Sequence, residues 1–262
     1  MRHRASGKGE PAGLSRTTTT VGSMKQKLTL GLTLICVLVS LAHARVVTSP
    51  ASHTPMNLLG ETALLRHHHD SGRYMADIAY VDGRAEKFRT RRLSGRTLAL
   101  VLDIDEAALS SWPEMAADDF AYFPHAPCRF VRGRPSLPCG ALAWDRLEKS
   151  AAIRPTLPLF DFAQAHGVRV FFITGRYASE RAVTTENLVK AGYVGWNPKN
   201  LLMEPNGMHV PSAADFKAAE RKWIEYKLGY TIVMNVSDQR SDLAGGYSEG
   251  EFKLPNPFYG IP

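Results

Sequence analysis

Three short, nearly continuous runs of apolar residues stand out along the chain, at 98–102, 168–173 and 231–236. Such runs lack the alternation of polar and apolar positions that a half-exposed strand shows. They are typical of central strands in a parallel sheet, because helices cover both faces of such a sheet. We therefore predict three parallel strands at these positions.

Elsewhere, apolar residues recur at spacings of three and four, a pattern that predicts amphipathic helices. A glycine follows three of these segments, and glycine commonly ends a helix. Ser212 and Asp215 have the spacing of a capping box at the start of the last segment. Strands that alternate with helices predict an α/β fold, here a three-layer, Rossmann-like sandwich. The predicted helices cover about residues 74–90, 156–166, 179–191 and 213–228.

Two stretches do not fit this alternation. Residues 45–60 are polar and contain proline, so we expect a flexible lead-in. Residues 112–145 are rich in glycine, proline and cysteine, and their aromatic residues follow no helical or strand period. A loop of this length is either disordered or a cap over a site. Its aromatic residues favour a cap, although they could also form a local core: Trp112, Phe120, Tyr122, Phe123 and Trp144.

The N-terminus has the pattern of an export signal. Lys25 and Lys27 precede an apolar run at 28–41, and Ala42-His43-Ala44 follows it. A basic segment, a short apolar segment and an A-x-A site are typical of a cleaved signal peptide, with a buried core helix as the alternative. We expect 1–44 to be an extension and signal, and 45–262 to be one exported domain, periplasmic or secreted, with no membrane anchor after cleavage.

Charge is concentrated in the same N-terminal stretch. Residues 1–44 hold six basic side chains and one acidic side chain, a net +5 of the chain's +7. The remaining +2 provides no broad basic surface, so we expect no nucleic-acid polymer as a partner. After signal cleavage Cys128 and Cys139 remain, 11 positions apart. In an oxidising compartment they predict a disulfide, with two unrelated buried thiols as the alternative.

Polar residues follow each predicted strand, at 103–106, 174–176 and 237–242. The carboxyl ends of parallel strands meet at one edge of a sheet, where ligands bind in open α/β folds. Carboxylates brought together there repel one another, and a bound Mg²⁺ relieves the repulsion. Lys217, in the helix before the third strand, has the charge needed to contact a phosphoryl oxygen. It could also be an ordinary solvated lysine.

The sequence motifs at these positions resemble those of a known family. The segments LVLDIDEAALSSWP, FFITGR and GYTIVMNVSDQRSDLAG, with the helix from Lys217 to Arg221, resemble the haloacid dehalogenase superfamily over about residues 65–255. Within it, the chain is similar to acid phosphatases of the class B type, which include plant vegetative storage proteins. The resemblance implies Mg²⁺-dependent hydrolysis of small phosphomonoesters, best at acidic pH, on a fold with a small cap after the first motif strand.

The resemblance also implies roles for individual residues. Asp103 would attack phosphorus and form an aspartyl phosphate, and Asp105 would be the general acid and base. Mg²⁺ would bind the carboxylates of Asp103 and Asp238 and the backbone carbonyl of Asp105. Asp242 would contact a metal-bound water or orient Lys217. The phosphoryl oxygens would be bound by Thr174, Gly175 and Lys217, with Arg176 bracing the loop by an ion pair.

Two positions depart from the family pattern. Ala107 stands where threonine or valine is usual, which removes a hydroxyl that could hold Asp105. Ser237 replaces a glycine before the last motif, which would narrow the site if that backbone needs a positive φ. The triplet at 67–69 (His-His-His) is expected to be solvated or capping, because consecutive helical residues point apart. A non-catalytic storage protein, or a nucleotidase or phosphotransferase, remains an alternative function.

Overall fold

The computed structural model describes residues 56–89, 97–207 and 212–261. The predicted export signal, its cleavage site and the start of the predicted lead-in lie outside these residues. Among the described helices, none combines the length and apolar character that crossing a bilayer requires.

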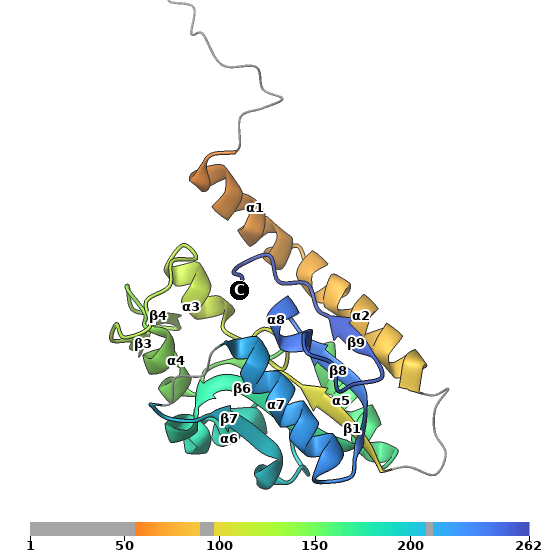
Figure 1. Ribbon diagram of the computed structural model, residues 1–262. Helices are drawn as coiled ribbons and strands as arrows, with labels where there is room; N and C mark the ends of the chain where they lie inside the picture. The colour runs from red at the N-terminus through yellow and green to blue at the C-terminus, as the bar shows by residue number, and fades with distance from the viewer. Residues whose placement is uncertain (1–55, 90–96, 208–211, 262) are drawn as a thin grey trace, which may run out of the picture. The chain divides into compact units, whose positions relative to one another are not determined.

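A five-stranded sheet forms the centre, in the order β7–β6–β1–β8–β9, with every neighbouring pair parallel (Figure 1). The three predicted strands are confirmed and lie side by side in the middle. Two edge strands were not predicted, because each is very short. The strands are β1 (Leu98–Leu102), β6 (Arg169–Tyr177), β7 (Leu201–Glu204), β8 (Thr231–Ser237) and β9 (Glu251–Lys253).

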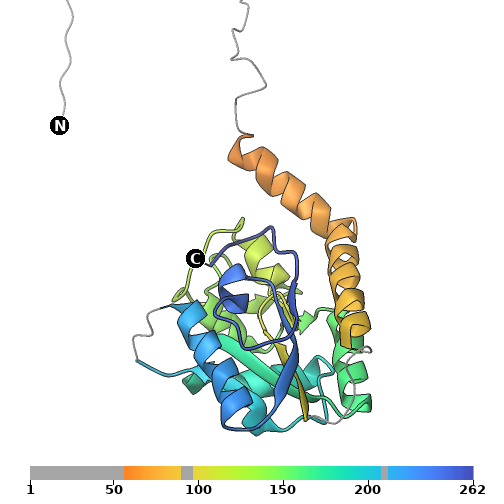
Figure 2. The same cartoon turned by 45° about the vertical axis from the view of Figure 1, so that its right-hand side comes forward.

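Helices cover both faces of the sheet, which confirms the three-layer α/β sandwich (Figures 1 and 2). On β1, Ala99 and Val101 pack in one cluster with Phe216 and Ile224 of the helix α7. Leu98, Leu100 and Leu102 face the opposite cluster, to which the other three helices contribute. All five β1 residues are buried, as the apolar run predicted. The covering helices are α2 (Arg73–Arg89), α5 (Thr156–Ala165), α6 (Arg181–Lys190) and α7 (Ala213–Tyr226).

Capping fixes where the flanking helices begin. The Ser212 hydroxyl accepts a hydrogen bond from the Asp215 amide at the start of α7, as the capping-box spacing predicted. The expected flexible lead-in is wrong at its end, because α1 (Leu58–Asp70) begins there and Asn57 caps it. Of the solvated or capping role expected for the triplet, the solvated alternative is wrong for His69, whose ring stacks on Trp112 with centroids 3.6 Å apart. Short helices occur at η1 (Ala178–Glu180), η2 (Pro198–Asn200) and α8 (Arg240–Leu243).

The chain between β1 and α5 is regular at several places, so the expectation of a loop without elements is wrong. Two short antiparallel strands, β2 (Leu109–Ser110) and β5 (Ala151–Ala152), pair at its two ends. Between them lie two helices and a two-stranded hairpin: α3 (Trp112–Ala117), β3 (Phe130–Val131), β4 (Arg134–Pro135) and α4 (Ala141–Leu147). We refer to residues 109–152 as the insertion.

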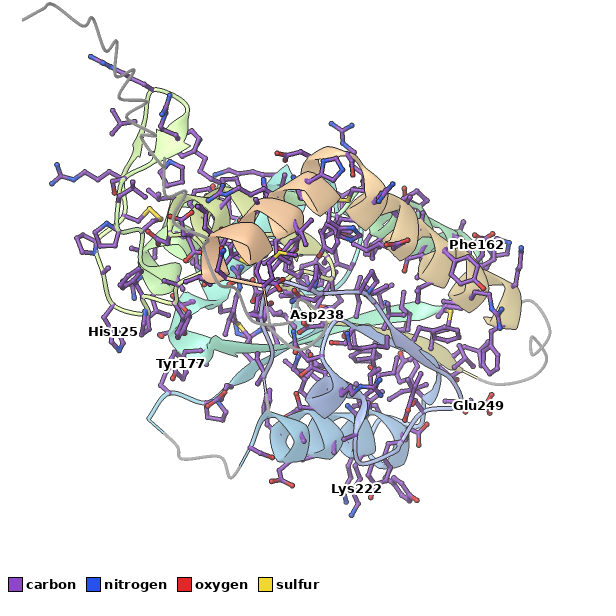
Figure 3. The ribbon with its side chains drawn as sticks, turned by 90° about the horizontal axis from the view of Figure 1, so that it is seen from above. His125, Phe162, Tyr177, Lys222, Asp238 and Glu249 are labelled. Carbon is purple, nitrogen blue, oxygen red and sulfur yellow. A yellow bond between two sulfur atoms is a disulfide. The ribbon has the colours of Figure 1, made fainter. Side chains whose placement is uncertain are left out.

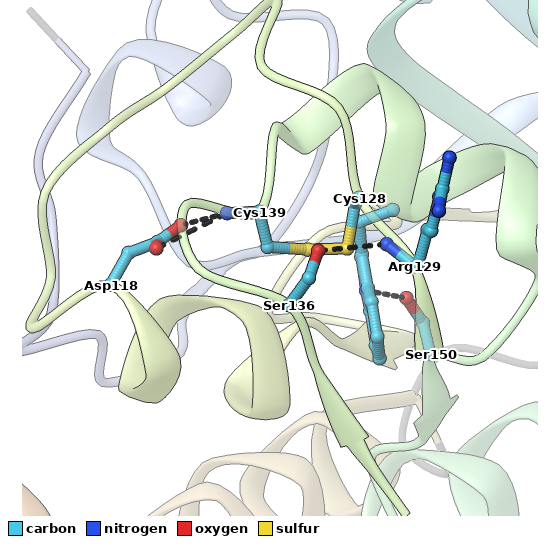
Figure 4. Close-up of a disulfide and its surroundings, with 7 residues drawn as sticks. Asp118, Cys128, Arg129, Ser136, Cys139 and Ser150 are labelled. Atoms are coloured by element: carbon cyan, nitrogen blue, oxygen red, sulfur yellow. Dashed lines mark hydrogen bonds between the residues drawn. A yellow bond between two sulfur atoms is a disulfide. The ribbon is translucent and has the colours of Figure 1, made fainter. Parts of the chain in front are cut away.

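The predicted disulfide between Cys128 and Cys139 is present and ties the insertion together (Figure 4). The Cys139 amide donates to both carboxylate oxygens of Asp118, at 2.9 and 3.2 Å. Trp144 is buried nearby and its indole N–H donates to Ser150 at 2.9 Å. A covalent link and buried polar contacts therefore order a segment whose sequence has no clear period.

The aromatic residues of the insertion divide into two groups. Trp112 and Phe120 pack against Phe258, with ring centroids 5.1 and 5.8 Å away, so these rings form local core, as Trp144 does. Tyr122 and Phe123 are exposed, with 75% and 40% of their surface accessible. A role as part of a cap over the site therefore stays a prediction for these two rings alone.

Candidate functional site

The polar residues predicted to gather do so at the carboxyl edge of the three central strands. Asp103 directly follows β1, Asp238 directly follows β8, and Asp242 lies on α8. The expectation that the second strand ends before Thr174 is wrong, because β6 continues to Tyr177. Its pairing with β7 shifts register between Thr174 and Tyr177, so the strand bends out of the regular ladder where its polar residues lie.

Lys217 lies inside this site and is not a solvated surface lysine. It is 5% exposed, and its ammonium lies 2.7 Å from one oxygen of Asp103 and 2.7 Å from one oxygen of Asp242. Burial alone would lower the pKa of Lys217, but the two carboxylates raise it overall. Burial raises the pKa of Asp103 well above its usual range, and Lys217 opposes that rise. The lysine thus stabilises the charged form of a buried carboxylate.

Asp103, Asp238 and Asp242 form the acidic cluster in which a cation could bind. One oxygen from each lies within 4.8 Å of the others. The Oδ1 atoms of Asp238 and Asp242 are buried and have no hydrogen-bond partner. A buried, unpaired carboxylate oxygen is costly unless a donor or a metal ion satisfies it. Hard divalent cations prefer such oxygens, so this donor set fits a divalent metal.

The remaining oxygens of the same two carboxylates are fully paired. Asp238 Oδ2 accepts from the side-chain amides of Gln239 and Asn256, each at 2.7 Å. Asp242 Oδ2 accepts from Lys217 and from the Ser237 hydroxyl. Each carboxylate therefore presents one unpaired oxygen. The condition set for Ser237 to narrow the site is not met, because its backbone does not have a positive φ.

A second buried cation lies beside Asp105. Arg176 contacts Asp105 with Nη2 at 2.6 Å and Nε at 3.0 Å, and its Nη2 also lies 2.8 Å from Asp145. Asp145 belongs to α4 of the insertion, and burial raises its pKa to about 7. Arg176 therefore joins the sheet edge to the insertion by ion pairs. This agrees with the bracing role expected for it.

Thr174 and Gly175 differ in their surroundings. Thr174 is fully buried, and its hydroxyl accepts from the Arg176 amide at 3.1 Å. Gly175 is exposed, and an added Cβ there would meet no atom within 4 Å. Open space over a backbone at this edge is compatible with the approach of a ligand. Contacts of these residues with phosphate stay predictions.

The sequence of the chain matches a known family over most of its length. The sequence model of the HAD superfamily, subfamily IIIB (acid phosphatase), matches residues 24–262. The chain belongs to this family. A stem 28 kDa glycoprotein of Glycine max is 39% identical to it over 45% of this chain and 46% of the relative. Acid phosphatase 1 of Solanum lycopersicum is 32% identical over 62% of this chain and 58% of the relative.

A further relative of this subfamily IIIB chain is named as a storage protein and not as a phosphatase. Vegetative storage protein 1 of Arabidopsis thaliana is 30% identical over 62% of this chain and 55% of the relative. The matched region thus spans less than two thirds of each of these relatives. Two solved structures of the class C acid phosphatase from Bacillus anthracis, one with tungstate bound, share the fold. Their TM-scores are 0.60 and 0.58 at 17% and 18% identity, each over 78% of this chain and 85% of theirs.

Three residues that shape the site of this family member received no role from the sequence. Asp145 lies in the segment without period, so no pattern marked it. Glu106 is fully buried and accepts from the Tyr74 hydroxyl at 2.6 Å and the Ser111 amide at 2.7 Å. Arg221 is also fully buried and donates to the backbone carbonyls at 242, 244 and 246. Its place four residues after Lys217, on the same helical face, was the available signal.

Proposed function

We propose that this protein is an exported, Mg²⁺-dependent acid phosphatase that hydrolyses small phosphomonoesters through an aspartyl-phosphate intermediate. The observation that carries the proposal is the surroundings of Asp103. This carboxylate lies between a buried lysine and two carboxylates with unpaired oxygens, at the edge of the sheet where α/β folds bind ligands. Membership of the acid phosphatase family supports the same chemistry.

In the proposed reaction, a carboxylate oxygen of Asp103 attacks phosphorus and the bond from phosphorus to the ester oxygen breaks. Asp105 gives its proton to the leaving alkoxide, which departs as an alcohol. A water molecule then attacks phosphorus in the aspartyl phosphate, and Asp105 takes one of its protons. Inorganic phosphate leaves and the Asp103 carboxylate is regenerated. Because Asp105 and Asp103 are two positions apart in the chain, one substrate can contact both.

Several groups would stabilise the charge that develops on the phosphoryl oxygens. The Lys217 ammonium is fixed beside Asp103, and Thr174 and the Gly175 backbone lie in the last part of β6. Mg²⁺ would bind Asp103 and Asp238 through carboxylates and Asp105 through its backbone carbonyl. We add the unpaired oxygen of Asp242 as a candidate contact to the ion or to its water. When bound, Mg²⁺ neutralises negative charge as a Lewis acid.

Export is the other part of the proposal. The N-terminal pattern, the disulfide and the glycoprotein name of a relative support passage into an oxidising compartment. We propose a secreted or periplasmic protein with a small-molecule substrate and without a nucleic-acid partner. The exposed rings of Tyr122 and Phe123 are also compatible with a nucleotidase or a phosphotransferase, which would use the same reaction chemistry. The resemblance to vegetative storage proteins keeps a storage role as the second candidate.

The test is hydrolysis of p-nitrophenyl phosphate by the purified protein. Asp103→Asn should lower kcat by at least about 10⁴-fold, because an amide cannot form the covalent intermediate. Asp119→Asn, a change at an exposed carboxylate of the insertion, is the matched control and should keep the rate. EDTA should abolish activity, and added Mg²⁺ should restore it. Hydrolysis by the Asp103→Asn variant at the original rate would refute the mechanism, whereas absence of hydrolysis by the wild type would favour the storage role.

A further inference from the structure

The last residues of the described chain, 254–261, return to the active-site edge of the sheet, and we call them the C-terminal tail. Figure 1 shows the end of the chain beside α8. The Leu254 amide donates to the Ser237 carbonyl at 2.8 Å, and the Ser241 hydroxyl donates to the Ile261 carbonyl at 3.0 Å. Both ends of the tail are thus attached to the segment that contains Asp238 and Asp242. Asp238 is buried, and Figure 3 labels it near the middle of the view.

Two amide side chains connect this tail to Asp238. Asn256 Nδ2 and Gln239 Nε2 both donate to Asp238 Oδ2, each at 2.7 Å. The oxygen of each amide is also engaged, which fixes which end of the amide faces the carboxylate. Asn256 Oδ1 accepts from the Phe258 amide at 2.9 Å, and Gln239 Oε1 accepts from the Ile261 amide at 3.0 Å.

The consequence is a carboxylate with two different oxygens. Oδ2 has two donors, whereas Oδ1 is buried and unpaired, within the acidic cluster with Asp103 and Asp242. A carboxylate fixed through one oxygen cannot rotate to satisfy the other. Hydrogen bonds of this kind orient metal ligands, and their loss typically weakens metal binding by 10-fold to 100-fold.

We propose that the C-terminal tail is part of the metal site, with Asn256 as a positioning residue that directs the free oxygen of Asp238 toward the cation. The proposal rests on the proposed Mg²⁺ dependence and deepens it. Asn256 does not touch the substrate or the ion. It acts through Asp238, and the sequence motifs at the strand ends do not include it.

A purely structural role is the competing explanation, because the tail also packs in the core. Phe258 is buried against Tyr74, with ring centroids 4.8 Å apart, and against Phe120. Loss of Asn256 could therefore loosen the tail without any effect on the metal. The Ser241→Ala variant separates the two explanations, because it removes a bond that attaches the tail but leaves both donors to Asp238.

The experiment measures Mg²⁺ binding by isothermal titration calorimetry, without substrate, for the wild type and for Asn256→Ala, Gln239→Ala and Ser241→Ala. Melting temperatures with and without Mg²⁺ accompany each titration, and circular dichroism verifies folding. Asn256→Ala should raise the Kd for Mg²⁺ about 10-fold or more, and Gln239→Ala should act in the same direction, because both amides share one oxygen. Ser241→Ala should keep the Kd within about twofold of the wild type, since no donor to the ligand is lost.

The outcomes separate a failure of this proposal from a failure of the proposed Mg²⁺ dependence on which it rests. A wild-type protein that binds no Mg²⁺ would overturn the proposed metal dependence and, with it, the role of the tail. If the wild type binds Mg²⁺ and Asn256→Ala binds it equally well, only the role of the tail is wrong. A Ser241→Ala variant that weakens binding as much as Asn256→Ala would assign the effect to tail packing. If Asn256→Ala does not fold, Gln239→Ala decides by the same comparison.

Discussion

Two of the buried cations of the site each lie between two carboxylates. Lys217 contacts Asp103 and Asp242, and Arg176 contacts Asp105 and Asp145. The lysine ammonium is a compact charge, and one of its two partners, Asp242, retains an unpaired carboxylate oxygen. The planar guanidinium contacts both oxygens of Asp105. We call these two groups the lysine cluster and the arginine cluster.

The difference between the clusters indicates a division of tasks. The lysine cluster, with Asp238 beside it, has more negative charge than one lysine can neutralise, so it favours a further cation. The arginine cluster contains a residue of the insertion, Asp145, so it also fastens that segment to the sheet edge. The first cluster is thus suited to bind metal and phosphate, and the second to fix the position of the proposed general acid.

Of the changes that compare the two clusters, removal of the lysine should have the largest effect. Lys217→Met should lower kcat for p-nitrophenyl phosphate by about 10²-fold to 10³-fold, because it removes a positive charge fixed next to the proposed nucleophile, Asp103. Lys222→Met is the matched control, since Lys222 lies on the same helix and is exposed (Figure 3). Steady-state kinetics at saturating Mg²⁺ measure the effect. If Lys217→Met keeps more than half of the activity, Lys217 is a structural counter-ion only.

A smaller loss is expected from the arginine cluster. Arg176→Ala should lower kcat by about 10-fold to 100-fold and also lower the melting temperature, because two carboxylates lose their shared partner. Arg169→Ala changes an exposed arginine at the other end of the same strand and should have no effect on either. Kinetics and thermal unfolding of both variants check this. An unchanged kcat with a lowered melting temperature would leave Arg176 a purely structural role.

The smallest expected effect is a change in how stability depends on pH, and it comes from Glu114, a carboxyl group of the insertion. Burial, with Asp118 and Asp145 nearby, raises the pKa of Glu114 from 4.5 to about 8. Between these values the folded protein binds a proton that the unfolded chain releases. The contribution of Glu114 to stability is therefore present below pH 4.5 and is lost as the pH rises toward 8.

Glu114→Gln stays uncharged, so it should be more stable than the wild type by about 2 kcal/mol near pH 8 and equally stable near pH 4. Urea unfolding at the two pH values measures the difference. Glu86→Gln, at an exposed glutamate of α2, should leave the pH dependence of stability as it is in the wild type. A Glu114→Gln variant with the same pH dependence as the wild type would contradict the assignment.

The local pattern of apolar residues was sufficient to predict the central strands of the sheet and the helices that cover them. The apolar run at 98–102 matches β1 at both ends, and the predicted helix 156–166 differs from α5 by one residue. The insertion could not be predicted in this way, because short helices and a disulfide order it instead of a long apolar stripe. For the same reason the edge strands β7 and β9, of four and three residues, gave no detectable period.

The sequence by itself determined which residues follow the central strands, and with them the family and the candidate roles of Asp103, Asp105 and Asp238. Only the tertiary structure decided how these groups are paired. Lys217 reaches Asp103 across 114 positions of sequence, and Asn256 reaches Asp238 from the C-terminal tail. Hydrogen bonds and ion pairs form between groups that are a few ångströms apart in space. The positions of two residues along the chain therefore do not reveal whether they pair.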